Sequence, residues 1–229
     1  MTEPKLSLMD TGDGSHSLYH AELDESYHSH HGALRESQYV YIEQGLSLLP
    51  DARPIRILEV GLGTGLNVML TVLAQRARPA ITVEMLSLEP YPVPVDLVDQ
   101  LNYSALLESD AADQAVFRQI HTAAWDTPTA LSPGMTFTKT QNRLETQILP
   151  DNHFDILYYD AFAPNKQSDI WAAANFEKTF AATRPGGLLV TYCAQGQFKR
   201  DMRAAGYQLG PRLAGPPGKK EMVRGVKPN

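Results

Sequence analysis

A glycine-rich segment at residues 59–67 constrains the fold more than any other part of the chain. It reads Glu-Val-Gly-Leu-Gly-Thr-Gly-Leu-Asn, follows an apolar strand-like run at 55–60, and precedes a stretch at 65–77 with helical spacing of its apolar residues. Alternating glycines let backbone approach a ligand, and the start of a helix offers free N–H groups. The segment predicts a strand–turn–helix unit that binds a nucleotide-like cofactor. A glycine turn that merely packs strand against helix is the alternative.

The rest of the chain continues this alternation of strands and helices. Strands are predicted at 81–88, 135–139, 154–159 and 187–193, helices at 94–101, 169–182 and 196–205, a sharp turn at 184–187, and a closing strand pair at 206–210 and 221–226. Such alternation favours an α/β fold with a Rossmann-like, doubly wound, mostly parallel sheet whose ligands bind at the carboxyl ends of the strands.

The length of 229 residues suits one compact unit. We expect residues 1–50 to form an N-terminal extension or lid, with a polar, His-rich stretch at 11–31 and a helix at 33–48, packed on a cofactor-binding domain at 51–229. The stretch 103–129 has weak periodicity and is left unassigned.

Composition places the chain in a reducing compartment. Cys193 is the one cysteine, the N-terminus lacks the basic start and apolar run of an export signal, and no apolar run reaches the roughly 18 residues of a membrane span. These features predict a cytoplasmic protein with no membrane segment. The net charge is −6, yet residues 199–229 contain eight basic and two acidic side chains. This basic C-terminal segment either binds a short piece of RNA backbone or is simply a solvated surface.

The glycine spacing also indicates which cofactor binds. The dinucleotide fingerprint is G-x-G-x-x-G, but Leu66 takes the place of its third glycine, and the observed G-x-G-x-G is common in S-adenosylmethionine enzymes. Glu89 ends the next predicted strand, where a carboxylate can accept both hydroxyls of a ribose. S-adenosyl-L-methionine is therefore the predicted cofactor.

A second acidic position follows the strand predicted at 154–159. Asp160 begins the segment Asp-Ala-Phe-Ala-Pro at the edge of the sheet where the cofactor's methyl group would lie. An amine acceptor, with a pKa of about 10 when free, must be neutral to attack, and a carboxylate can orient it and take its proton. Phe162 and Tyr159 either border this site or are ordinary core aromatics.

Six segments together resemble one family, the methyltransferases that complete the 5-methylaminomethyl group on the wobble uridine of tRNA. They are residues 29–37, 59–67, 89–92, 160–164, 184–187 and 218–222, and the most specific are 160–164 and 218–222. The resemblance implies methyl transfer from S-adenosyl-L-methionine to the aminomethyl nitrogen of uridine 34, with the anticodon region of tRNA as the substrate. Many members are fused to a flavin-dependent oxidase; because this chain ends at residue 229, we expect a stand-alone type that works with a separate enzyme supplying the aminomethyl precursor.

The resemblance also implies roles for individual residues, with Asp160 as the catalytic group. Predicted cofactor contacts are Glu59, Gly61, Gly63, Thr64, Gly65, Asn67, Glu89, Gln141 and Asp160. Predicted substrate contacts are His31, Glu36, Ser37, Phe162, Pro164, Lys219 and Lys220. One departure concerns the adenine: relatives have Gly-Asp after the third strand, whereas residues 138–142 read Thr-Lys-Thr-Gln-Asn, so Gln141, Asn142 or backbone groups take over that contact.

Other chemistries compete with this interpretation. Five of the seven histidines fall between residues 16 and 31, but no cysteine or regular ligand spacing accompanies them, so no metal is predicted. One alternative is methyl or aminopropyl transfer to a small amine; another is an oxidoreductase module that binds a dinucleotide. The cofactor that remains bound after purification separates the oxidoreductase from both transferases.

Overall fold

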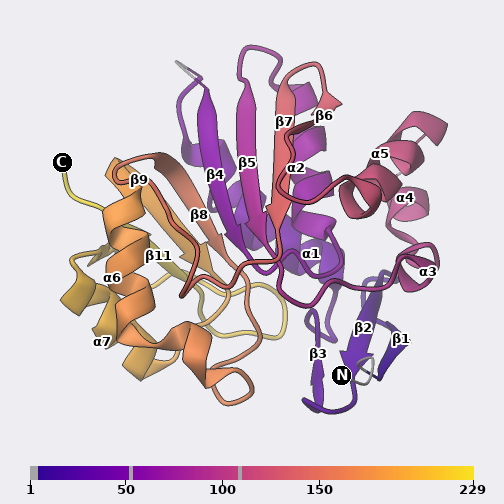
Figure 1. Ribbon diagram of the computed structural model, residues 1–229. Helices are drawn as coiled ribbons and strands as arrows, with labels where there is room; N and C mark the ends of the chain where they lie inside the picture. The colour runs from indigo at the N-terminus through magenta and orange to yellow at the C-terminus, as the bar shows by residue number, and fades with distance from the viewer. Residues whose placement is uncertain (1–4, 52–53, 108–109) are drawn as a thin grey trace.

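The computed structural model describes residues 5–51, 54–107 and 110–229. Within them, eight strands form a main sheet in the order β10-β11-β9-β8-β4-β5-β7-β6 (Figure 1). The central strands β7, β5, β4, β8 and β9 are mutually parallel, and the outer strands β6, β11 and β10 pair antiparallel. Their bounds are β4 Ile55–Val60, β5 Val83–Leu88, β6 Thr129–Ser132, β7 Met135–Thr140, β8 Phe154–Tyr159, β9 Thr183–Thr191, β10 Gln208–Leu209 and β11 Val223–Val226. The predicted α/β fold with a mostly parallel sheet is confirmed.

Helices cover both faces of the main sheet (Figure 1). Successive side chains of a strand point to opposite faces, so Ile57 of β4 joins the core beneath α2 (Leu66–Ala77) and α5 (Ala111–Thr122), whereas Leu58 joins the core beneath α6 (Ala173–Ala182) and α7 (Gly196–Ala205). Both side chains are fully buried, and each such burial stabilises the fold by about 1.5–3 kcal/mol.

The order of the strands fixes where a ligand can bind. From β4 the chain first adds β5 and β7 on one side, and later returns to add β8 and β9 on the other side. The loops that follow β4 and β8 therefore diverge at the carboxyl ends of two neighbouring strands and leave a crevice there. Both the glycine-rich segment and Asp160 stand at this crevice.

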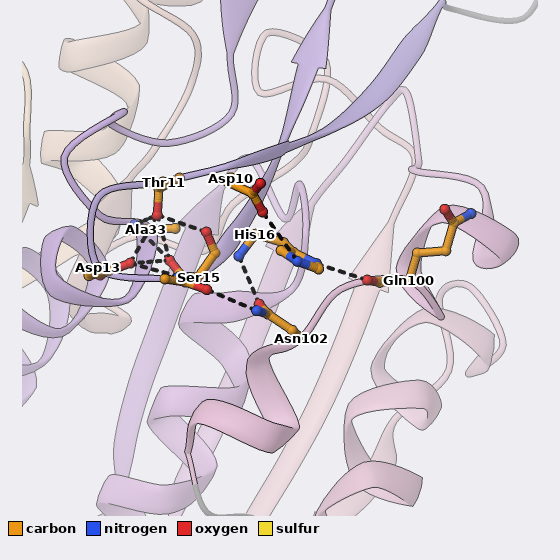
Figure 2. Close-up of polar contacts among 9 residues, drawn as sticks. Asp10, Thr11, Asp13, Ser15, His16, Ala33, Gln100 and Asn102 are labelled. Atoms are coloured by element: carbon orange, nitrogen blue, oxygen red, sulfur yellow. Dashed lines mark hydrogen bonds and ion pairs between the residues drawn. The ribbon is translucent and has the colours of Figure 1, made fainter.

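The N-terminal region forms its own small antiparallel sheet of β1 (Leu6–Asp10), β2 (His16–His20) and β3 (Glu25–Ser26), which lies beyond the carboxyl ends of β4 and β5 (Figure 1). Figure 2 shows how its first turn is attached to the rest of the protein. Asp13 accepts a hydrogen bond from the backbone N–H of Arg35 (3.0 Å), and the backbone N–H of His16 donates to Asn102 (2.8 Å). These bonds tie the small sheet to the helix that starts at Ala33 and to the segment after α3 (Val95–Val98).

Several predicted elements differ in detail. The helix expected at 33–48 is divided into α1 (Ala33–Ser37), a π-helical turn (Gln38–Glu43) and a 3-10 turn (Leu46–Leu48). A side chain at Gly45 would lie 2.4 Å from the carbonyl oxygen of Tyr41, so the chain turns tightly there. The His-rich stretch 11–31, for which no strand was predicted, contains β2 and β3.

Further differences lie later in the chain. The unassigned stretch 103–129 contains α4 (Tyr103–Leu106) and α5, and η3 (Ser168–Trp171) precedes α6 within the helix expected at 169–182. The sharp turn expected at 184–187 is part of β9, where the pairing register with β8 shifts. Parts of two predictions lie outside the described residues: residues 1–4 of the N-terminal extension and residues 108–109 of the stretch 103–129. Residues 52–53 lie outside them as well.

None of the helices formed by the described residues is both long enough and apolar enough to span a bilayer.

Candidate active site

A cavity of about 760 Å³ opens at the carboxyl ends of the central strands. Its floor includes Val60, Leu88 and Asp160 at the ends of β4, β5 and β8, and the segment 20–27 of the N-terminal sheet forms part of its wall. The segments 89–92, 143–145 and 160–162 complete the wall near the sheet, together with Lys166, Gln167, Ser168, Asp169, Ile170 and Tyr192. The cavity therefore lies between the sheet edge and the predicted extension at 1–50, whose role as a lid stays a prediction.

The first glycine of the loop after β4 is required by close contact. Gly61 has φ +93°, and a Cβ at this position would lie 2.5 Å from the carbonyl oxygen of Asp160. The Gly61 N–H donates to the Leu88 carbonyl (3.0 Å), and the Asp160 N–H donates to the Val60 carbonyl (2.9 Å). The loop is thus fixed to both neighbouring strands, and its backbone borders the cavity at Gly61 and Gly63.

Thr64 lies beneath the loop and anchors it. Its carbonyl accepts a hydrogen bond from Nε2 of His121 (3.1 Å), and its hydroxyl contacts the Tyr103 hydroxyl (3.3 Å) and Nε2 of His28 (3.5 Å). Burial lowers the pKa of His28 and of His121 to about 4, so both imidazoles are neutral near pH 7. Thr64 and Gly65 are buried, and neither belongs to the cavity wall.

Glu89 faces the loop from the end of β5. One carboxylate oxygen accepts from the Gly63 N–H (2.8 Å) and the other from the Tyr91 N–H (2.9 Å). Burial raises the pKa of Glu89 to about 7, against the effect of these two hydrogen bonds. Each oxygen retains a further lone pair for a hydroxyl donor, as the predicted ribose contact requires.

Asp160 lies on the cavity wall, where its carboxylate accepts a hydrogen bond from Nδ2 of Asn67 (2.8 Å). Burial raises the pKa of Asp160 to about 6, while Tyr41 and Asn67 oppose that rise. The carboxylate is therefore ionised at pH 7.5 yet basic enough to accept a proton. Asn67 belongs to α2, so this contact joins the glycine-loop helix to the end of β8.

Glu59 lies deeper and is fully buried. It accepts a hydrogen bond from the Ser87 hydroxyl (2.5 Å), and burial raises its pKa to about 8. Among the described residues, Glu59 Oε1 and Asn67 Oδ1 have no hydrogen-bond partner. The site thus holds unsatisfied polar atoms next to Asp160, an arrangement that suits a polar ligand.

These residues fit S-adenosyl-L-methionine. Burial raises the pKa of three neighbouring carboxyl groups, Glu59, Glu89 and Asp160, because their negative charges are poorly solvated there. A ligand with a sulfonium and an ammonium group relieves that excess of negative charge. The glycine backbone at 61–63 and the Glu89 carboxylate border the same cavity, so one ligand can contact all of them.

The predicted substrate residues form two groups. Phe162 lies on the cavity wall, where its ring meets Tyr27 edge-on with centroids 4.9 Å apart; Pro164, two residues on, is partly exposed. The other group does not line the main cavity. In it, Glu36 pairs with Lys219 (2.5 Å), Ser37 has a buried hydroxyl without a partner among the described residues, and His31 contacts Gly218. Lys220 is exposed.

Gln141, a predicted cofactor residue, does not line the cavity. Gln141 is exposed after β7, whereas its neighbours Arg143, Leu144 and Glu145 line the wall. Residues 143–145 are thus better placed than Gln141 to contact a bound ligand, and the Gln141 contact stays a prediction.

Sequence reasoning missed Tyr41, Tyr192 and Lys139. Burial, and then the negative charge of Asp160, raise the pKa of the Tyr41 and Tyr192 hydroxyls. Lys139 is almost fully buried; it donates to the His121 carbonyl and lies over the Trp125 ring, and burial lowers its pKa to about 8. Tyr41 lies on the π-helical turn, and no local pattern marks such a turn in a sequence.

Comparison with known proteins bears on the cofactor and the family. Residues 129–228 match a family model described as S-adenosyl-L-methionine-dependent methyltransferase. The chain is 29% identical over 231 residues to the tRNA 5-methylaminomethyl-2-thiouridine biosynthesis bifunctional protein MnmC of Pseudoalteromonas atlantica, covering 89% of this chain and 31% of the relative. The MnmC protein of Pseudomonas fluorescens is 30% identical over 219 residues, covering 89% of this chain and 32% of the relative. The chain thus spans about a third of the length of these curated relatives.

A solved structure supports the fold. The crystal structure of MnmC2 from Aquifex aeolicus superposes with a TM-score of 0.72 at 22% sequence identity, covering 99% of this chain and 71% of that one. At this identity the likeness concerns the fold. With the glycine loop and the acidic cavity, the sequence matches lead to one assignment: the chain is an S-adenosyl-L-methionine-dependent methyltransferase domain that is similar to part of the MnmC proteins.

Proposed function

We propose that this domain methylates the nitrogen of the 5-aminomethyl group on wobble uridine 34 of tRNA, giving 5-methylaminomethyl-(2-thio)uridine. The observation that carries the proposal is the position of Asp160, a partly desolvated carboxylate on the wall of the cofactor cavity and next to the glycine loop. The names of the MnmC relatives, which specify tRNA 5-methylaminomethyl-2-thiouridine biosynthesis, support this choice of acceptor.

The residues of the chain then have distinct tasks. Gly61, Gly63 and Glu89 hold the cofactor, with Asn67 linking its helix to Asp160. Bound S-adenosyl-L-methionine supplies a methyl group on a positively charged sulfur that leaves as a neutral thioether. Asp160 binds the acceptor amine and takes one proton from it, so that the nitrogen lone pair is free to form the new bond to carbon. Most of the acceleration comes from alignment and exclusion of water, since direct displacement needs little covalent help.

The surface near Asp160 supports a nucleic-acid acceptor. Lys220 is exposed beside the Glu36 and Lys219 pair, and Arg35 is exposed on α1. Phosphates adjoining the target nucleotide can pair with such side chains, although the chain as a whole carries a charge of −6. We propose a limited contact with the anticodon region, in the cytoplasm, and a partner enzyme that supplies the aminomethyl precursor.

The decisive test is transfer of labelled methyl from S-adenosyl-L-methionine to tRNA that lacks this modification, followed by nucleoside mass spectrometry. We expect label in 5-methylaminomethyl-type uridine. Cofactor binding without label in RNA would contradict the proposal. It would favour a small cationic amine, because Glu22, Glu145 and Asp169 also line the cavity.

A further inference from the structure

Two adjacent lysines of the 218–222 segment occupy different environments. Nζ of Lys219 lies 2.5 Å from Oε2 of Glu36 and 3.6 Å from the centroid of the Tyr192 ring. The Lys220 side chain is exposed. Lys219 is therefore engaged inside the protein, whereas Lys220 is available to phosphates.

The partners of Lys219 are themselves held in place. Glu36 is 4% exposed, and its other carboxylate oxygen accepts a hydrogen bond from the Ser29 N–H (3.1 Å). The Tyr192 hydroxyl donates to the carbonyl of Ala161 (2.8 Å), the residue after Asp160, which ties the ring to the catalytic segment. A carboxylate and an aromatic face are both favourable partners for an ammonium ion, so its location is well defined.

Tyr192 links this ammonium to the segment of Asp160, and Lys219 lowers the pKa of Asp160. Six groups of the described residues act on Asp160 or respond to its charge. They come from α1, the π-helical turn, β4, α2, the segment after β9 and the 218–222 segment. They are Glu36, Tyr41, Glu59, Asn67, Tyr192 and Lys219. Among these groups of the described chain, Lys219 alone carries a positive charge.

We propose that Lys219 is a positioning residue for methyl transfer: its ammonium, fixed by Glu36 and Tyr192, keeps Asp160 ionised and keeps the bound acceptor amine uncharged. The inference rests on the proposed function, because it requires an amine beside Asp160. A fixed cation favours the anionic form of a neighbouring carboxylate and disfavours the cationic form of a neighbouring amine. The first effect keeps Asp160 in the ionised form that can accept a proton, and the second makes the amine easier to deprotonate before its nitrogen attacks.

The environment gives the sign of each effect. Burial raises the pKa of Asp160 to about 6; Tyr41 and Asn67 lower it, Glu36 raises it and Lys219 lowers it. Removing the positive charge of Lys219 therefore moves the acidic limb of the pH–rate profile to higher pH, and removing the negative charge of Glu36 moves it to lower pH. Removing both charges leaves the limb near that of the wild type.

The test compares Lys219→Met, Glu36→Gln and the double variant in single-turnover methyl transfer to unmodified tRNA between pH 5 and 9. For each single variant we expect a shift of about 1 pH unit, upward for Lys219→Met and downward for Glu36→Gln. Lys219→Arg keeps the charge and restores the wild-type limb. Lys220→Met is the matched control: it leaves the limb in place and lowers the salt slope of tRNA binding by about 1.

A second measurement does not depend on tRNA. The titration of Asp160, followed by NMR of ¹³C-labelled aspartate carboxyls in the ligand-free variants, should shift in the same directions. If the folded single variants kept the wild-type acidic limb of the pH–rate profile and the wild-type titration of Asp160, the proposal would be overturned. Lys219 would then only hold the 218–222 segment in place. If wild-type protein transfers no methyl to tRNA, the proposed function fails, whereas unchanged titrations refute the role of Lys219 itself.

Discussion

Replacing Gly61 with alanine separates the two reasons for a glycine at this position, and two other glycines serve as controls. Gly61 has φ +93° and a Cβ there would lie 2.5 Å from the Asp160 carbonyl oxygen. Gly14 has φ +84° but open space around its Cβ position. Gly210 has open space as well, and its φ lies outside the left-handed range. Alanine therefore meets strain and collision at Gly61, strain alone at Gly14, and neither at Gly210.

The expected changes in the free energy of unfolding follow from the backbone strain and the collision at each position. A left-handed φ costs a non-glycine residue about 1–2 kcal/mol, and a less flexible unfolded chain returns about 0.4–1 kcal/mol. Gly14→Ala should therefore destabilise the protein by roughly 0–2 kcal/mol, whereas Gly210→Ala, which meets no strain, should stabilise it by about 0.4–1 kcal/mol. Gly61→Ala adds an overpacking cost of about 1–3 kcal/mol, because the opposing atom is backbone that β8 holds in place.

Urea unfolding measures these stabilities, and calorimetry measures the affinity for S-adenosyl-L-methionine. Because the methyl group at Gly61 pushes on the Asp160 backbone, we expect its variant to bind the cofactor at least about tenfold more weakly, a loss of about 1.4 kcal/mol. The affinities of Gly14→Ala and Gly210→Ala should match the wild type. If Gly61→Ala were no less stable than Gly14→Ala and bound the cofactor normally, the contact with Asp160 would have no energetic consequence and the reasoning would be refuted.

Three further predictions concern the carboxyl groups of the site. Asp160→Asn can keep the hydrogen bond from Asn67 but cannot accept a proton, so the single-turnover rate should fall about 10²–10⁴-fold while the cofactor affinity measured by calorimetry changes little; full activity would remove Asp160 from the reaction. Glu89→Gln places an amide NH₂ against one of two backbone N–H donors, which costs about 1–3 kcal/mol and should weaken cofactor binding at pH 8. Because burial raises the pKa of Glu89 to about 7, the difference in cofactor affinity between the variant and the wild type should be smaller at pH 6. A difference in affinity that does not change with pH would contradict this account. Burial raises the pKa of Glu59 from 4.5 to about 8, so the stability linked to its neutral form is present below pH 4.5 and is lost as the pH rises through 8. Glu59→Gln should accordingly increase the free energy of unfolding of the ligand-free protein at pH 8.5 more than at pH 5, and equal effects in urea unfolding at both pH values would show that Glu59 is not buried in its neutral form.

Local patterns predicted the parallel core of the fold well. The strands ending at Val60, Leu88 and Tyr159 match the structure at their last residues, because wholly buried parallel strands are continuous apolar runs bounded by turn residues. The N-terminal sheet was missed, although Gly12-Asp13-Gly14 between two alternating stretches is a hairpin signal. Helix α5 was missed as well, although Asp110 caps its first turn by accepting from the Asp113 N–H.

The residues of the candidate site also fall into those that local patterns predicted and those that they did not. Gly61, Glu89 and Asp160 each follow a strand, and parallel strands in a doubly wound sheet bring their carboxyl ends together, so spacing along the chain sufficed to predict that they meet. Tyr41, Tyr192 and the pairing of Lys219 with Glu36 were not predictable in this way. They depend on a π-helical turn and on contacts between separate segments of the chain, such as the pair of Lys219 and Glu36, which are 183 positions apart.

The sequence by itself determined the class of fold, the cofactor loop and the acidic edge of the sheet, because each of these depends on residues close together in the chain and on the fixed geometry of strands. Only the tertiary structure decided which of two neighbouring lysines lies inside, which carboxyl groups have raised pKa values, and which side chains surround Asp160. The physical reason is that burial and charge interactions depend on which distant segments pack together, and local sequence patterns do not specify that packing.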